Sequence, residues 1–365
     1  MARLGYDRMM GGNCLNVQKN GEIEFFRLVF CLAVAGLHLN SHFPMGLFER
    51  GAFGVEFFFL VSGYFMARSA ERVTELDFPV VCGFLKRKVS TFFPYYIGAV
   101  LIQTLVLRIL IQRISLHDLL TGAVDLIPEA LFLQMSGLAT ESSLNISAVW
   151  YLSALLLSLL LLYPFAARHK KTYGIVFLCL AIFTIGYRYK LHGCLVVFRS
   201  KECGPFFDGM VRGLGEVALG AVCYQFSLYL REKPLSRLQR RLLTAVKYLG
   251  YAAVIVFSFS NYDRRFEASF LIVLALCLTL TGSEITCNIP YNRFTAYCGA
   301  ISLPIYLFHS VVLRCADTLY PDSTPSAQEL VLIVLTMLLF SVLFKYLCDF
   351  CRSGLLRLHQ KASAQ

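Results

Sequence analysis

Long apolar runs, separated by short polar and charged segments, alternate along this chain from residue 23 to residue 350. An α-helix needs about 20 mostly apolar residues to cross the hydrocarbon core of a bilayer, and most of these runs approach that length. A shorter apolar segment at 128–136 (PEALFLQMS) cannot cross, so we expect it to be re-entrant or interfacial. The pattern predicts about ten transmembrane helices, at residues 23–40, 51–69, 91–113, 148–166, 173–189, 209–229, 242–260, 266–283, 296–316 and 328–350.

The composition indicates the same class of protein. The 365-residue chain is 57% hydrophobic and 16% charged, whereas average soluble domains carry about 25% charged residues. No polar stretch is long enough to fold separately. We therefore predict an all-α, polytopic helical membrane protein with a cytoplasmic N-terminal segment (1–22), one transmembrane domain (23–350) and a cytoplasmic tail (351–365).

The formal net charge of +11 would suggest nucleic-acid binding in a soluble protein. Here the basic residues gather in alternate loops, which is the distribution that the positive-inside rule describes. We expect a multi-pass protein of the plasma (cell inner) membrane with both termini in the cytoplasm, the lipid bilayer as its partner and no nucleic acid. The predicted cytoplasmic loops and tail hold Arg68, Arg72, Lys86, Arg87, Lys88, Arg168, Lys170, Lys171, Arg231, Lys233, Arg237, Arg240, Arg241, Lys247, Arg352, Arg357 and Lys361.

Two ionisable side chains, Arg27 and His38, lie inside the first apolar run. At 100° and 1.5 Å per residue, they project from nearly the same helix face and lie roughly 16 Å apart along the axis. Such groups are costly in a bilayer, so we expect them to face a partner or a cavity. The alternative is two residues near the interfaces, the arginine snorkelling and the histidine hydrogen-bonded to a neighbouring helix.

Glu56 lies in an aromatic block of the second run, GAFGVEFFFLVSGYFMARS, where a carboxylate needs a partner or a proton. It is either a protonated group hydrogen-bonded within the bundle or a group that orients or charges His38. The small residues Ser62 and Gly63 in the same run favour close helix packing.

The basic trio of Lys86, Arg87 and Lys88 precedes the third predicted span. Such a trio commonly anchors a loop to anionic lipid. It could also bind the phosphates of a nucleotide-bearing cofactor at the inner mouth of the bundle.

The remaining candidates are Trp150, Tyr306 and His309. The only tryptophan opens the fourth span, where an interfacial position is ordinary. His309 lies inside the ninth span, on the same face as Tyr306, and either joins a polar interior or makes a structural hydrogen bond. The thirteen cysteines show no zinc or disulfide spacing, although Cys194 and Cys203 share one loop and could pair.

Taken in order, these features resemble the membrane acyltransferase-3 family over most of the chain. The resemblance rests on Glu24, the Arg27–His38 spacing, the GVEFFFLVSGYF block at 54–65, the basic run before Pro94-Tyr95, WYL at 150–152 and IYLFH at 305–309. One position departs from the family pattern. Members often carry two basic residues three apart before the proline, and here Lys88 is followed by Thr91, so Arg87 or Lys86 would have to substitute.

The resemblance implies an acyl-CoA-dependent O-acyltransferase that moves an acetyl or other short acyl group from cytoplasmic acyl-CoA to a carbohydrate, such as a surface polysaccharide or lipid-linked glycan. It implies donor binding by the basic trio and Arg27, with no metal. His38 would be the catalytic base, assisted by Glu56, or would carry the acyl group transiently. The resemblance also marks Glu24, Trp150, Tyr306 and His309 as substrate-binding or structural positions.

Two other functions stay open. A transporter or flippase would use the same buried charges to line a permeation path, although no internal repeat is visible. A scaffold subunit of a polysaccharide-synthesis system would not need His38 at all. The sequence also leaves open whether the protein forms a homo-oligomer.

Overall fold

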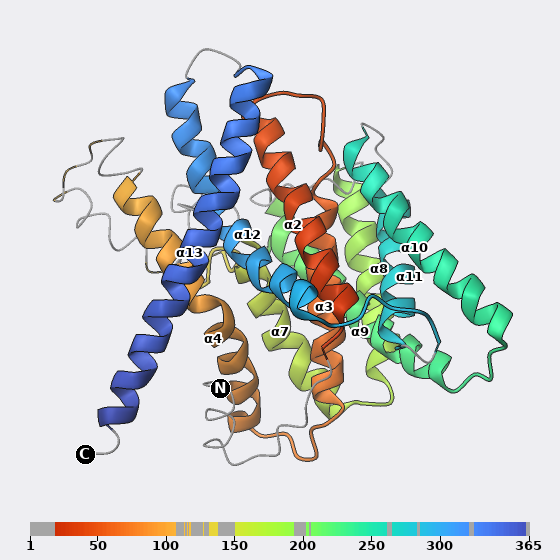
Figure 1. Ribbon diagram of the computed structural model, residues 1–365. Coiled ribbons are helices and arrows are strands. Elements are labelled where there is room, and N and C mark those ends of the chain that lie inside the picture. Colours follow the sequence, from red (N-terminus) through yellow and green to blue (C-terminus); the bar gives the residue numbers. More distant parts are fainter. Residues whose placement is uncertain are drawn as a thin grey trace.

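The structure, a computed structural model, describes residues 19–106, 113, 115, 117, 127, 131–137, 150–192, 202–203, 206–260, 265–282, 285–320 and 325–362. In this part of the chain ten α-helices form a bundle (Figure 1), and two short strands pair antiparallel before α9. The elements are α2 (Gly21–His42), α3 (Phe53–Ala70), α4 (Phe78–Gln103), α7 (Trp150–Arg168), α8 (Tyr173–His192), β1 (Glu202–Cys203), β2 (Phe206–Phe207), α9 (Asp208–Arg231), α10 (Arg237–Phe259), α11 (Arg265–Leu280), α12 (Arg293–Leu319) and α13 (Ala327–Ala362).

Each predicted span overlaps one of these helices, so the all-α polytopic class is confirmed. Six helices are individually long and apolar enough to cross a membrane: α4, α7, α8, α10, α12 and α13. By contrast, α11 has only 16 residues, fewer than the roughly 20 that a perpendicular crossing needs. The count of ten crossings therefore stays a prediction. The proposed pairing of Cys194 with Cys203 lies outside the described side chains.

The helix α4 begins well before the predicted start at residue 91. Asp77 caps it by accepting a hydrogen bond from the Val80 amide at 2.8 Å, and a proline occupies the first turn. Hydropathy marks where apolar residues begin, whereas capping decides where the helix begins. The basic trio consequently lies inside α4 and not in the loop before it.

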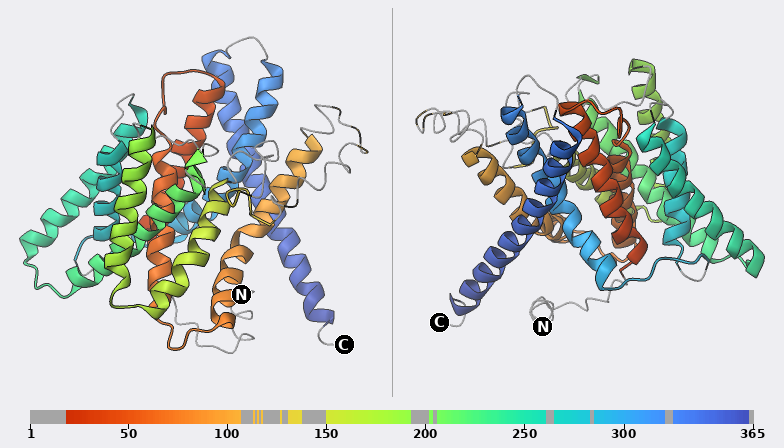
Figure 2. Two further views of the ribbon diagram at one scale, coloured as in Figure 1. Left: turned by 180° about the vertical axis from the view of Figure 1, so that it is seen from behind. Right: turned by 45° about the horizontal axis from the view of Figure 1, so that its top comes forward.

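At the centre of the bundle, α2 lies between α12 and α3, and α3 packs against α9 (Figures 1 and 2). Two glycines permit the α3–α9 contact. A Cβ on Gly63 would collide with the carbonyl of Val217, and a Cβ on Gly220 would collide with the carbonyl of Leu60. The predicted packing role of the Ser62-Gly63 pair is therefore confirmed, since small residues let the backbones approach closely.

In the described part of the short apolar segment, residues 131–136, the side chains of Phe132, Gln134 and Met135 are buried, whereas Leu131 and Ser136 are exposed. The Ser153 hydroxyl of α7 donates to the Phe132 carbonyl at 2.7 Å and accepts from the Met135 amide at 3.0 Å. The Phe132 ring also contacts Tyr96 of α4, with ring centroids 4.5 Å apart. Non-helical backbone survives among membrane helices where protein groups satisfy its hydrogen bonds, as they do here.

The loops that the charge pattern assigns to the cytoplasm meet at one end of the bundle, which we call the inner end (71–77, 168–172, 231–236, 281–282 and 285–292). Lys170 donates to the carbonyls of Glu71 and Val73, at 2.8 and 2.6 Å, and Arg231 donates to the carbonyl of Thr281 at 3.0 Å. The connection from α2 to α3, the end of α12 and the start of α13 lie at the opposite, outer end (Figure 1). This alternation agrees with the loops assigned from charge.

Candidate active site

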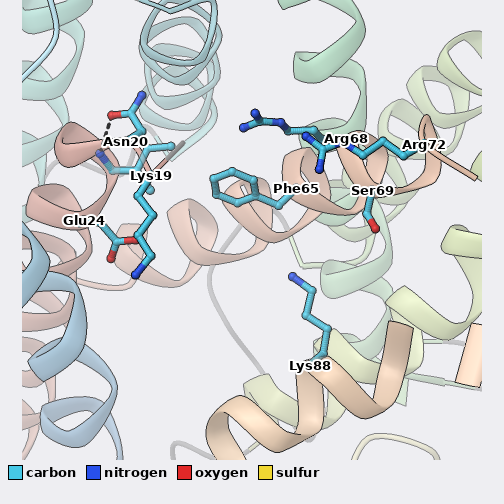
Figure 3. Close-up of a pocket in the computed structure, with 9 residues that line it drawn as sticks. Lys19, Asn20, Glu24, Phe65, Arg68, Ser69, Arg72 and Lys88 are labelled. Atoms are coloured by element: carbon cyan, nitrogen blue, oxygen red, sulfur yellow. Dashed lines mark hydrogen bonds between the residues drawn. The ribbon is translucent and has the colours of Figure 1, made fainter. Parts of the chain in front are cut away.

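A pocket lined by several cationic side chains lies at the inner end (Figure 3). Its volume is about 310 Å³, and it lies between the start of α2, the end of α3 and the first half of α4. Four cationic side chains and one carboxylate, that of Glu24, line the pocket. We call it the basic pocket, and its lining residues are Lys19, Asn20, Ile23, Glu24, Phe65, Arg68, Ser69, Arg72 and Lys88.

Only Lys88 of the predicted basic trio lines this pocket. Lys86 and Arg87 are exposed on the surface of α4. The partners of Lys88 in the pocket are Arg68 and Arg72, which the sequence analysis took only as topology signals. Arg68 lies in the last turn of α3 and Arg72 just beyond its end, and the local sequence gives no sign that both face a pocket.

Arg27 lies one turn deeper along α2 than the pocket residue Glu24, and the two side chains form an ion pair at 3.2 Å. Arg27 keeps 31% of its side chain exposed. It also lies close enough to Lys88 and to Tyr151 to interact with both electrostatically. Arg27 therefore marks the border between the basic pocket and the interior, which agrees with its predicted place further along a donor path.

Three aromatic side chains from different helices lie between Arg27 and His309, in the direction of the outer end. Phe58, Tyr151 and Tyr306 contact one another, with ring centroids 5.8 to 6.2 Å apart. The Tyr151 hydroxyl is hydrogen-bonded to Ser62. Tyr306 in turn contacts His309, with centroids 6.0 Å apart, so these rings connect the arginine to the second histidine.

The two predicted histidines lie together, and we call them the histidine pair. The rings of His38 and His309 have centroids 5.1 Å apart, because α2 and α12 pack side by side. His309 is fully buried, and its Nδ1 lies 3.1 Å from the Ile305 carbonyl oxygen. His38 is half-buried. One turn further out, His42 and Asp317 form an ion pair at 2.6 Å with side chains 28% and 41% exposed, so the pair lies near the outer end.

Glu56 has contacts other than the one that the sequence suggested. One carboxylate oxygen accepts from Arg212 at 3.1 Å and the other accepts from Ser269 at 3.1 Å. A Cβ on Gly54 would meet the Phe30 carbonyl, so Glu56 lies near the level of Phe30. That level is about 12 Å along α2 from His38, at 1.5 Å per residue. The predicted action of Glu56 on His38 stays a prediction, and Arg212 is its observed cationic partner.

Arg212 is the main buried charge that the sequence analysis missed. It is 1% exposed, and its Nε donates to Glu216 at 2.7 Å in addition to the bond with Glu56. Its guanidinium lies 5.9 Å from the centroid of the Trp150 ring. The spacing of Arg212 and Glu216, four residues apart in an apolar span, could have predicted their pairing.

Trp150 is therefore not a lipid-interface residue, since it is 6% exposed and packs beside this buried arginine. A single tryptophan at the start of an apolar run gives no sign of whether it faces lipid or protein. Its place depends on the position of α9, which the local sequence does not contain.

Another buried ion pair, between Lys247 and Glu22, lies at the inner end beside the basic pocket. The Lys247 ammonium contacts Glu22 at 2.8 Å, Asn288 at 2.7 Å and the Cys287 carbonyl at 2.6 Å. Glu22 also accepts from Thr279 and Tyr248. These contacts fix the start of α2 against the segment before α12, and so hold one wall of the basic pocket in place.

A family model described as an acyltransferase domain (Acyl_transf_3) matches residues 20–346. The match includes the histidine pair, Arg27 and every residue of the basic pocket except Lys19. No significant match to a curated protein or to a solved structure is found.

Proposed function

Because this chain belongs to the acyltransferase-3 family of membrane acyltransferases, we propose that it moves an acetyl or other short acyl group from acyl-CoA to a hydroxyl of a carbohydrate. The single observation that carries the proposal is the arrangement along α2, with a basic pocket at its inner end and a histidine pair near its outer end. A donor with several phosphates and an acceptor with many hydroxyls need those two different environments.

The donor would bind at the basic pocket. Lys19, Arg68, Arg72 and Lys88 outnumber the carboxylate of Glu24, which itself is paired with Arg27. Cationic side chains gathered around a concave surface recognise phosphate through charge-assisted hydrogen bonds. The thin pantetheine arm would then pass Arg27 and the aromatic side chains of Tyr151 and Tyr306 toward the histidine pair. The exposed Lys86 and Arg87 would act from outside the pocket, and more weakly because of screening.

The transfer itself would occur at His38. The acceptor hydroxyl gives its proton to a neutral imidazole, its oxygen forms a bond to the thioester carbonyl carbon, the carbon–sulfur bond breaks, and the CoA sulfur receives the proton. A route through an acyl-histidine intermediate uses the same groups in two steps. The half-buried position of His38, one turn from the partly exposed side chains of His42 and Asp317, supports access for an acceptor from the outer side.

The donor site is tested by comparing acetyl-CoA with acetyl-pantetheine, which lacks the CoA phosphates. The wild-type protein should bind acetyl-CoA much more tightly. An Arg68→Gln, Arg72→Gln, Lys88→Gln variant should lose most of that preference, while a Lys86→Gln, Arg87→Gln control should keep it. Equal binding of the two donors by the wild type would contradict a phosphate site in the basic pocket.

The orientation requires the inner end to face the cytoplasm, and this also is testable. Single cysteines would be introduced at two exposed positions, Lys233→Cys at the inner end and Leu47→Cys at the outer end. Before that, serine would replace the exposed Cys82, Cys179, Cys287 and Cys351, together with Cys14, Cys194 and Cys203. A membrane-impermeant thiol reagent applied to intact cells should label position 47 and not position 233. The opposite pattern would place the basic pocket outside, away from cytoplasmic acyl-CoA.

A further inference from the structure

His309 has one ring nitrogen with a partner and one without. Its Nδ1 lies 3.1 Å from the carbonyl oxygen of Ile305, four residues earlier on its own helix. A carbonyl oxygen only accepts hydrogen bonds, so Nδ1 carries the proton in this contact and Nε2 carries a lone pair. The Nε2 atom is buried and has no hydrogen-bond partner among the residues that the structure describes.

Leaving a buried acceptor without a hydrogen bond is costly, so a histidine with a purely structural role would be expected to use both nitrogens. The imidazole geometry directs Nε2 away from the backbone of α12, because Nδ1 is turned toward it. The groups around this ring are the His38 ring at 5.1 Å, the Tyr306 ring at 6.0 Å and, further out, the ion pair of His42 with Asp317.

We propose that His309 is a second catalytic residue, the base for the acceptor hydroxyl, and that His38 carries the acyl group. This proposal rests on the function proposed above and chooses between its two routes. A neutral imidazole whose Nε2 lone pair has no hydrogen-bond partner can accept a proton from a hydroxyl placed beside it. His38 is the more exposed of the two and lies on the α2 face that leads from Arg27, so it is the one that a thioester would meet first.

The two steps balance without any further reagent. In the first, a ring nitrogen of His38 forms a bond to the thioester carbonyl carbon, the carbon–sulfur bond breaks, and the proton released by the imidazole goes to the CoA sulfur. In the second, the acceptor hydroxyl gives its proton to His309 Nε2, its oxygen takes the acyl carbon, and the carbon–nitrogen bond to His38 breaks. The proton on His309 then returns to His38, and both rings are neutral again.

The proposal predicts that His309→Gln separates the two steps. With radiolabelled acetyl-CoA and no acceptor, wild-type protein and His309→Gln should both become labelled on His38, as located by peptide mass spectrometry. On adding acceptor-bearing membranes, the wild type should lose the label quickly, and His309→Gln should lose it about 10²- to 10⁴-fold more slowly, the usual contribution of a general base. His42→Gln is the matched control, a nearby histidine outside the proposed chemistry, and should behave like the wild type.

Label on His38 that leaves equally fast in His309→Gln would overturn the role of His309. Absence of label in the wild type, together with normal acylation of glycans, would overturn the acyl-histidine route while keeping the proposed function. No acylation by the wild type would instead contradict the function itself. Failure of His309→Gln to bind acetyl-CoA would indicate that this variant is not folded. In that case ¹⁵N NMR of histidine-labelled wild-type protein measures which ring nitrogen of His309 carries the proton. A proton on Nε2 would contradict the proposal.

Discussion

The basic pocket and the histidine pair differ in nearly every physical property although both are built on α2. The pocket is open at the inner end, is lined by four cations, and holds side chains that water reaches. The histidine pair lies near the outer end, and one of its two rings, that of His309, is fully buried. The proposed donor binding and the proposed chemistry therefore lie at opposite ends of one helix. Charges that recognise phosphate tolerate solvent, whereas a base needs an unprotonated nitrogen placed beside the reacting groups.

The largest expected effect is at the histidine pair. His38→Ala should leave the Kd for acetyl-CoA nearly unchanged and lower acyl transfer by about 10²- to 10⁴-fold, because only the chemical step loses its catalyst. Arg27→Ala should instead weaken donor binding, and Arg27→Lys should recover part of it if charge alone matters. Equilibrium binding and single-turnover kinetics on the same preparations measure both. Loss of donor binding in His38→Ala would remove the separation of the two regions.

A smaller effect is expected at the basic pocket. Neutralising Arg68, Arg72 and Lys88 together with glutamine should raise the KM for acetyl-CoA by about tenfold at low salt and by less at high salt, since exposed charges are screened. Neutralising Lys86 and Arg87, which are exposed outside the pocket, should change the KM by less than about twofold at physiological salt. Equal effects of the two sets would indicate general attraction to anionic surfaces and not a phosphate site.

The smallest expected effect on turnover is at Glu56. Glu56→Gln leaves Arg212 with one carboxylate, Glu216, so one buried cation still faces one buried anion. We expect turnover per folded molecule to stay within about twofold, because loss of a charge that acts on no reacting atom leaves the base in place. The sequence-based prediction that Glu56 assists His38 requires a much larger fall. Turnover normalised to acetyl-CoA binding sites separates these outcomes.

The same contrast shows what the sequence could predict. The apolar runs predicted the ten helices in the part of the chain that the structure describes, and they placed Arg27 and His38 in one helix, α2. His309 was identified as a buried polar group, although its neighbour His38 lies in a different helix. These predictions succeeded because period and hydropathy are local properties of the chain.

Features that depend on contacts between distant helices could not be predicted in the same way. The basic trio was divided because α4 begins at a cap and not at the first apolar residue, which left Lys86 and Arg87 outside the pocket. Arg212 was missed because its partner Glu56 is more than 150 residues away in sequence. Only the pairing of Arg212 with Glu216, four residues apart, was available from the sequence.

The central claim is that this membrane protein acylates a carbohydrate and that His38 is required. Mass spectrometry of surface glycans tests it most directly, on matched cells that lack the protein, produce the wild type, or produce His38→Gln at the same membrane level. Glutamine keeps a hydrogen-bonding group but has no useful basicity and cannot carry the acyl group. The account predicts an added acyl mass, such as that of acetyl, with the wild type alone, and the same acylation by His38→Gln would contradict it.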